Sequence, residues 1–192
     1  VLIRWSPTRL YSRPFPDPDR RAWFLANVCT EDWNRELDRG RSFAEGIAEL
    51  VARHPELERE IRAWDVEWHE MVPGPIEGSV AILEHLRASG IPTWSITNFS
   101  TEKYAEARER FPFLKGFRDT VVSAHERLLK PDPAIYRALL DRTRLAPETC
   151  LFVDDVAENV EGARSVGMNA EVFTTPEAFG ALLASHGLPV PG

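Results

Sequence analysis

Two adjacent aspartates, Asp154 and Asp155, follow a short apolar run at residues 150–153. Two carboxylates in a poorly solvated place repel each other, which raises their pKa values, and a bound cation removes that penalty. Oxygen ligands suit Mg²⁺, which keeps several of its waters and bridges to a substrate phosphate. Alternatively, one aspartate caps the helix that follows and the other faces water. The pair therefore indicates either a magnesium site or an ordinary start of a helix.

Lys130 and Thr97 are two further side chains that suit an anionic substrate. Lys130 lies between Leu129 and Pro131 in a stiff loop, so its ammonium could hold such a substrate close to an anionic nucleophile. Thr97 ends a β-branched and aromatic run and could donate its hydroxyl to a phosphoryl oxygen. Taken singly, a solvated surface lysine and an ordinary strand threonine are equally good interpretations. The order and spacing of all these residues carry more information than any one of them.

The C-terminal part of the chain alternates between strand and helix patterns. This alternation predicts an α/β fold, with a Rossmann-like parallel sheet covered by helices on both faces. Ligands bind outside the carboxyl ends of such strands, so Thr97, Lys130 and Asp154 should converge in one crevice. The expected strands are 93–97, 120–123, 150–153 and 170–173, and the expected helices are 77–88, 101–110, 133–142 with Asp132 as its N-cap, and 158–166 ended by Gly167.

The N-terminal third has a helical pattern without a convincing strand. Apolar residues recur at helical spacing over 20–28, 43–52 and 57–69, and residues 72–75 form a natural hinge. We therefore expect an α/β core of residues 1–7 and 75–192, into which a helical insert of residues 8–74 is placed. Residues 1–3, Val-Leu-Ile, are typical of the tail of a first strand that begins upstream.

Composition narrows the classes of partner. The net charge of −7 argues against broad nucleic-acid binding and against docking on an anionic membrane, since both depend on Lys and Arg. No apolar run approaches the ~18 residues that span a bilayer. The two cysteines, Cys29 and Cys150, are far apart and show no metal-ligand spacing, which favours a reducing, cytoplasmic setting.

The sequence resembles the haloacid dehalogenase superfamily along essentially its whole length. That family has a nucleophilic Asp after the first strand, a Ser or Thr after the second, a Lys before a later helix and an acidic pair after the fourth. Thr97 matches the second motif, Lys130 within residues 129–136 matches the third, and Asp154-Asp155 with Asn159 matches the fourth. The helical insert corresponds to the family's cap, which closes over the site and selects the substrate.

The resemblance is closest to the small sugar-phosphatase branch and implies a Mg²⁺-dependent phosphatase for a small phosphorylated metabolite. Lys130 and the magnesium ion would hold the charge, while Thr97 and Asn98 orient the phosphoryl oxygens. Asp155 would bind the metal, supported by Asp154 and Asn159. The nucleophilic Asp, which forms the aspartyl-phosphate, is expected four residues before Val1.

Two other functions stay open at this point. A 2-haloacid dehalogenase displaces halide from carbon without a metal, and its corresponding motif is less acidic than Asp154-Asp155, which favours the phosphatase. A chain without a nucleophile would instead be an inactive relic that binds a phosphorylated ligand or a partner. Trp33 in the insert and Arg4 after the first motif are further candidates for substrate contact, and the protein is expected to be a monomer or a homodimer.

Overall fold

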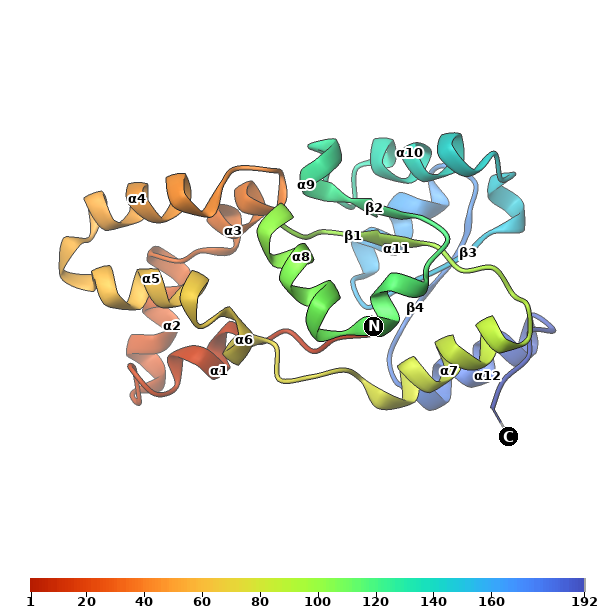
Figure 1. Cartoon of the computed structure of the whole chain (residues 1–192), viewed down its shortest axis with the longest axis horizontal. Coiled ribbons are helices and arrows are strands. Elements are labelled where there is room, and N and C mark those ends of the chain that lie inside the picture. Colours follow the sequence, from red (N-terminus) through yellow and green to blue (C-terminus); the bar gives the residue numbers. More distant parts are fainter. Residues whose placement is uncertain (192) are drawn as a thin grey trace.

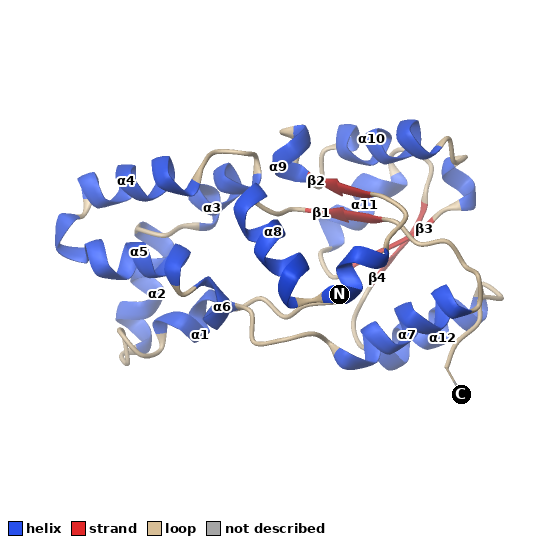
Figure 2. Cartoon of the chain, in the orientation of Figure 1, coloured by secondary structure: helices blue, strands red, loops and turns tan. Residues whose placement is uncertain are grey.

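The computed structural model describes residues 1–191, which contain four short strands arranged as two parallel pairs (Figure 1 and Figure 2). Strand β1 (Ser95–Thr97) pairs with β2 (Thr120–Val122), and Ile96 lies opposite Val121. Strand β3 (Leu151–Asp154) pairs with β4 (Asn169–Val172), and Asp154 lies opposite Val172. The predicted α/β class with parallel strands is confirmed.

Helices connect these strands, and several begin with the cap that the sequence offers. Asp132 accepts a hydrogen bond from the backbone N–H of Ala134, so the predicted N-cap is confirmed, and Ser100 caps the helix after β1 in the same way. Gly167, with φ +89°, follows the helix after β3. The helical elements of this part are α7 (Glu77–Ala88), α8 (Thr101–Arg110), η2 (Pro112–Gly116), α9 (Ser123–Glu126), α10 (Pro133–Thr143), η3 (Pro147–Thr149), α11 (Ala157–Arg164) and α12 (Pro176–Ser185).

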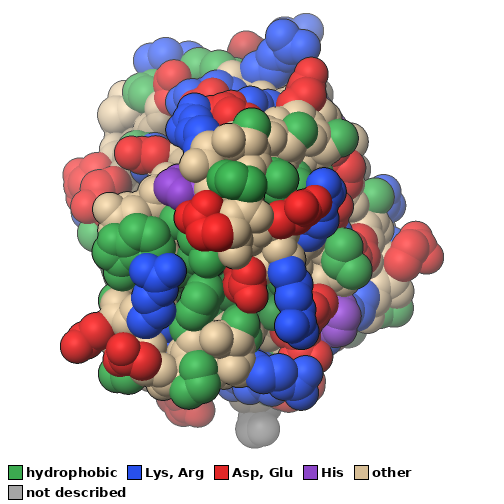
Figure 3. All heavy atoms as spheres, turned by 90° about the vertical axis from the view of Figure 1, so that its left-hand side faces the viewer, with side chains coloured by type: hydrophobic (Ala, Val, Ile, Leu, Met, Phe, Trp, Pro, Cys, Tyr) green, Lys and Arg blue, Asp and Glu red, His purple; other side chains and the backbone are tan. Residues whose placement is uncertain are grey.

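The N-terminal helices form a separate group in Figure 1, which we call the helical segment (α1–α6). The helix expected over 57–69 divides at Glu67, although the backbone N–H of Glu67 still bonds to the carbonyl of Ala63. Figure 3 faces the end of this group and shows basic and acidic side chains interspersed, without one sign dominating. Its elements are α1 (Pro7–Tyr11), α2 (Pro18–Asn27), α3 (Glu31–Asp38), α4 (Phe43–Arg53), η1 (Pro55–Leu57), α5 (Glu58–Val66) and α6 (Trp68–Met71).

Apolar burial divides into three clusters that hold these elements together. The largest joins the helical segment to α8, since it includes Trp64 and Trp68 together with Ala107 and Phe111. A second cluster lies between the strands and helices α10 and α11, and a third lies between α7 and α12. In Figure 1, α10 lies above the strands and α7 and α12 lie below them, so helices cover the sheet on two sides.

Residues 1–3 do not form the tail of a sheet strand, and the structure corrects that expectation. The backbone N–H of Ile76 donates to the carbonyl of Leu2, that of Arg4 donates to Gly74, and Ile3 forms a single antiparallel bridge with Pro75. A strand of the parallel sheet would need these hydrogen bonds for β1 or β3. The backbone uses these hydrogen bonds instead to hold the two linkers of the helical segment, residues 1–6 and 72–76, side by side.

Among the helices described, none is both long and apolar enough to cross a membrane.

Candidate active site

Asn98, Lys130 and Asp154 form one hydrogen-bonded group at the carboxyl ends of β1 and β3. The ammonium Nζ of Lys130 donates to Oδ2 of Asp154 at 2.5 Å. The side chain of Asn98 accepts from the backbone N–H of Lys130 at 2.9 Å and donates to its carbonyl at 3.1 Å. Asn98 thus fixes the backbone of the loop that carries Lys130. Thr97, the last residue of β1, directly precedes Asn98 in the sequence. Lys130 and Asp154 therefore meet as expected from the strand ends, while Thr97 is placed only by its position next to Asn98.

Asp154 is a buried carboxylate whose oxygens are fully engaged. Its side chain is 6% exposed, and Oδ1 accepts from the backbone N–H of Val156 and from the side chain of Asn159, each at 2.9 Å. Burial alone would raise the pKa of Asp154, but the Lys130 ammonium and these hydrogen bonds hold it below its ordinary value. The sequence predicts that a cation offsets the repulsion between the two aspartates. For Asp154, the ammonium of Lys130 supplies such a positive charge.

Asp155 differs from its neighbour because its carboxylate is open. Its side chain is 62% exposed, and one of its carboxylate oxygens lies 3.3 Å from the backbone nitrogen of Val1. Within residues 1–191, no three His, Cys, Asp or Glu side chains are grouped so that they could hold a metal. A magnesium ion that keeps most of its waters needs fewer protein ligands than that, so the open carboxylate of Asp155 fits such an ion. Asp154 and Asn159 bond to each other and would support the site.

Tyr136 supports the same group and was not singled out from the sequence. Its hydroxyl donates to the backbone carbonyl of Asn159 at 2.6 Å, and its ring packs edge-on against Phe152. Burial, with the charge of Asp154, raises the pKa of Tyr136, so the hydroxyl stays a donor. The sequence shows only an apolar helix position here, because the contact joins residues 23 apart in the chain.

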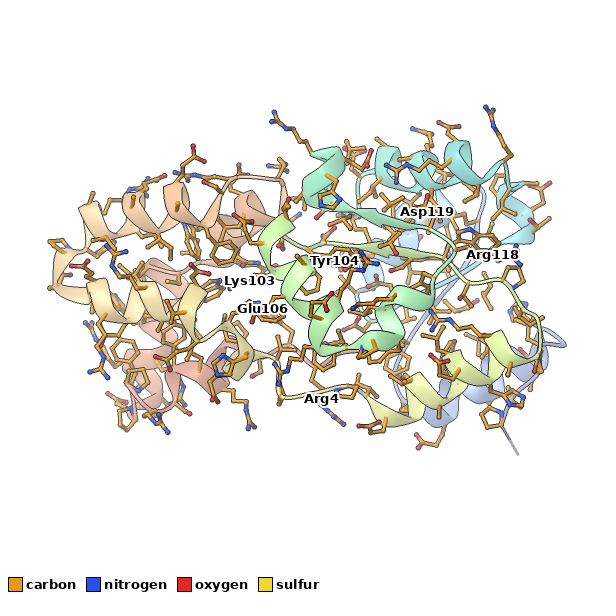
Figure 4. All side chains as sticks on the ribbon, in the orientation of Figure 1. Arg4, Lys103, Tyr104, Glu106, Arg118 and Asp119 are labelled. Carbon is orange, nitrogen blue, oxygen red and sulfur yellow. The ribbon has the colours of Figure 1, made fainter. Side chains whose placement is uncertain are left out.

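An open pocket of about 560 Å³ lies beside Asp155, between the two linkers of the helical segment. Arg4 lines it, and its guanidinium donates to the carbonyl of Pro75 at 2.7 Å. Figure 4 shows Arg4 on the linker below α8. The pocket combines guanidinium, carboxylate and apolar groups, and its lining also includes Ile3, Trp5, Arg9, Ile76 and Phe173.

Trp33 is not brought to this group. Its side chain is 8% exposed, its indole N–H donates to the carbonyl of Gly46, and its ring packs edge-on against Trp64. Its aromatic character therefore serves the packing of the helical segment. The sequence could not separate this from a pocket position, because both need an aromatic residue at the same helical spacing.

The fold and this arrangement define an α/β domain with an ion pair and an open carboxylate at the carboxyl ends of parallel strands. A family model described as haloacid dehalogenase-like hydrolase matches residues 14–167. The chain belongs to the haloacid dehalogenase-like hydrolase family.

Two curated relatives are phosphatases by name. The chain is 36% identical over 89 residues to phosphatase MT3486 of Mycobacterium tuberculosis. The matched stretch covers 46% of this chain and 41% of that protein. It is 28% identical over 129 residues to hexitol phosphatase A of Escherichia coli, which covers 67% of this chain and 57% of that protein. The matched stretches therefore span about half of the length of these relatives.

Solved structures share the fold over nearly the whole chain. The family enzyme bt-2542 of Bacteroides thetaiotaomicron, solved as a magnesium complex, has a TM-score of 0.74 at 17% identity and covers 95% of this chain and 93% of its own. A dehalogenase solved with an intermediate has a TM-score of 0.67 at 14% identity over the same shares of the two chains. Because a family enzyme with bound magnesium and a dehalogenase both share this fold, the fold alone does not decide the reaction.

Proposed function

We propose that the protein is a Mg²⁺-dependent phosphatase that acts on a small phosphorylated metabolite. The observation that carries the proposal is the bonded group of Asn98, Lys130 and Asp154 at the strand ends, with the open carboxylate of Asp155 beside it. A fixed ammonium next to a site for a divalent cation suits a phosphoryl dianion. The names of the curated relatives support the same reaction.

The described residues divide the work between holding charge and orienting the substrate. Lys130 pairs with phosphoryl oxygens while Asp154 keeps its ammonium in place, and Thr97 and the backbone N–H of Asn98 orient the phosphoryl group. Asp155 binds the metal, and Asn159 supports it through Asp154. When bound, magnesium neutralises charge on the phosphoryl oxygens during attack.

The attacking carboxylate is proposed to lie on a strand between β1 and β3, where the sequence-based expectation places it four residues before Val1. Within residues 1–191, the two strand pairs share one apolar cluster but are not joined by strand hydrogen bonds. A strand between them would bring its carboxyl end beside Thr97 and Asp154. Its aspartate would form a bond to phosphorus as the ester oxygen leaves, and water would then hydrolyse the acyl phosphate.

The helical segment would act as the cap over this site, which makes residues 8–74 the cap and the rest the core. The pocket beside Asp155 would take the leaving group, with Arg4 at its wall. We also propose that the protein works in the cytoplasm, as a monomer or a homodimer.

A 2-haloacid dehalogenase is the second candidate, and Arg4 is the observation that favours it. A guanidinium in the pocket could pair with the carboxylate of a haloacid. The open carboxylate of Asp155 argues for the phosphatase, because displacement of halide from carbon uses no metal.

The test is the magnesium dependence of Asp155→Asn in the full-length protein, with p-nitrophenyl phosphate as substrate. The wild type should lose turnover when EDTA removes the metal. Asp155→Asn should need at least ~10-fold more Mg²⁺ for half-maximal rate, because it loses a charged oxygen ligand. Glu158→Gln removes a nearby carboxylate outside the pocket lining and should behave as wild type. Metal-independent turnover, or an Asp155→Asn titration that matches the control, would refute the assignment.

A further inference from the structure

Ser123 has a hydroxyl that joins three parts of the molecule. It is fully buried directly after β2, at the start of α9. Its Oγ donates to the backbone carbonyl of Asp38 at 2.5 Å and accepts from the backbone N–H of Phe99 at 2.9 Å. The carbonyl of Phe99 lies 3.2 Å from the same oxygen. A hydroxyl has a single proton, so the shorter bond to Asp38 takes it.

These partners place Ser123 between the helical segment and the loop proposed to hold phosphate. Asp38 is the last residue of α3, and Phe99 follows Asn98, whose side chain fixes the backbone of Lys130. Without the Ser123 hydroxyl, the Asp38 carbonyl and the Phe99 N–H would need water as a partner. Water does not enter a fully buried site freely.

The chain at the end of α3 crosses α9 in such close contact that a movement of α3 would also move α9. A Cβ added at Gly40 would lie 2.7 Å from the carbonyl oxygen of Ala124, so the two backbones are in direct contact. Burial raises the pKa of the Asp38 carboxyl, and the backbone N–H of Ser100, at the N-terminus of α8, lowers it in part. The backbone carbonyl of Asp38 meets the loop through Ser123.

We propose that Ser123 is a positioning residue. Its hydroxyl fixes the orientation of the loop of residues 97–100 relative to the C-terminal end of α3. The inference rests on the proposed function of that loop. Removing the hydroxyl leaves the Phe99 N–H without its acceptor and the Asp38 carbonyl without its donor, in a place where each must be satisfied. The loop then loses its fixed orientation, and groups aimed at the phosphoryl oxygens in the transition state are the first to suffer.

The experiment compares Ser123→Ala with Ser79→Ala in the full-length protein. Ser79 in α7 is equally buried, but its hydroxyl has no hydrogen-bond partner among the described residues, so it controls for the loss of a buried oxygen. Ser123→Ala should lower kcat for p-nitrophenyl phosphate with Mg²⁺ by about 10- to 100-fold, and KM should change by less than ~3-fold because the leaving-group pocket is untouched. Ser79→Ala should keep both constants.

Hydrogen exchange gives a second readout that does not need turnover. The backbone amide of Phe99 should exchange at least ~10-fold faster in Ser123→Ala than in the wild type or in Ser79→Ala, because its acceptor is gone. Ser123→Cys keeps the branching of the side chain and a weak donor, although sulfur is larger than oxygen. It should lie between wild type and Ser123→Ala, and it serves if the alanine variant does not fold.

Equal kcat and equal exchange at Phe99 in Ser123→Ala and Ser79→Ala would overturn the positioning role. If the wild-type protein hydrolyses no phosphate ester, the proposed function fails. The exchange comparison alone then still decides whether Ser123 holds the backbone at Phe99. Faster exchange at Phe99 would then support it, and unchanged exchange would reject it.

Discussion

At the scale of single residues, the central feature is a buried ion pair whose carboxylate is hydrogen-bonded on both oxygens. Lys130 and Asp154 are 11% and 6% exposed, and Asp154 uses both oxygens. The sequence predicted that these residues would meet, because the ends of parallel strands meet. It did not predict that they would pair with each other, since the contact joins residues 24 apart and depends on the path of the lysine loop.

Lys130→Met should be strongly destabilising as well as inactive. Removing one partner leaves the Asp154 carboxylate buried without its counter-charge, which costs about 3–5 kcal/mol. The double variant Lys130→Met with Asp154→Asn should recover much of that loss but no activity. Urea unfolding measures both, and Lys115→Met is the control, because its pair with Glu109 is exposed and screened by water. A single variant as stable as the control would contradict the description of the pair.

Asp38 should make the protein less stable as pH rises from about 4 to 7. Burial raises its pKa from 3.8 to about 7, although the N–H of Ser100, Arg35 and Asn34 offset part of the effect. The folded state therefore holds a proton that the unfolded state has lost over this range, so stability falls as pH rises through it.

Asp38→Asn removes this titration, so it should gain stability relative to wild type as pH rises, and the gain should disappear toward pH 4. Thermal unfolding at pH 4, 5, 6, 7 and 8 measures the difference. Glu31→Gln, which removes a carboxyl from the first turn of the same helix, is the control. A flat difference for Asp38→Asn would show that its carboxyl titrates normally.

At the scale of elements, helix α11 must lie very close to the loop that carries Lys130. A Cβ added at Gly162 would lie 2.4 Å from the carbonyl oxygen of Pro131 and 2.9 Å from the ring of Tyr136. A glycine inside a helix usually costs stability, but here only glycine allows the approach. The sequence predicted α7 and α8 with the observed bounds, because their apolar periodicity is a local property of the chain. It could not predict this contact or the role of Ser123, which depend on how α11 and α9 meet other elements.

Gly162→Ala should lower the melting temperature by several degrees, since relieving such an overlap costs about 1–3 kcal/mol. Gly180→Ala in α12 is the matched control, because the nearest atom to its new Cβ is a side-chain carbon of Ile82 at 3.9 Å. The Gly180→Ala variant should gain about 0.5–1 kcal/mol in its free energy of unfolding, because alanine has a better helix propensity than glycine. Calorimetry compares the two, and equal stability would contradict the close approach of α11.

At the scale of the whole molecule, the helical segment is tied to α8. Lys103 of α8 is 9% exposed and pairs with Asp65 of the segment at 2.8 Å and with Glu106 at 2.9 Å. Figure 4 shows Lys103 and Glu106 on α8 beside the segment. The sequence predicted an insert joined by a hinge, but not this tie, because Lys103 and Asp65 are 38 residues apart. The segment and the site loop are thus mechanically linked through α8 and Ser123.

The most direct measurement of the central claim is a paired assay on the full-length protein. One arm measures phosphate released from p-nitrophenyl phosphate with Mg²⁺, and the other measures halide released from 2-chloropropionate with EDTA. The account predicts phosphate release in the first arm, abolished by Lys130→Met, and no halide in the second. Halide release without phosphate release, or neither product, would contradict it.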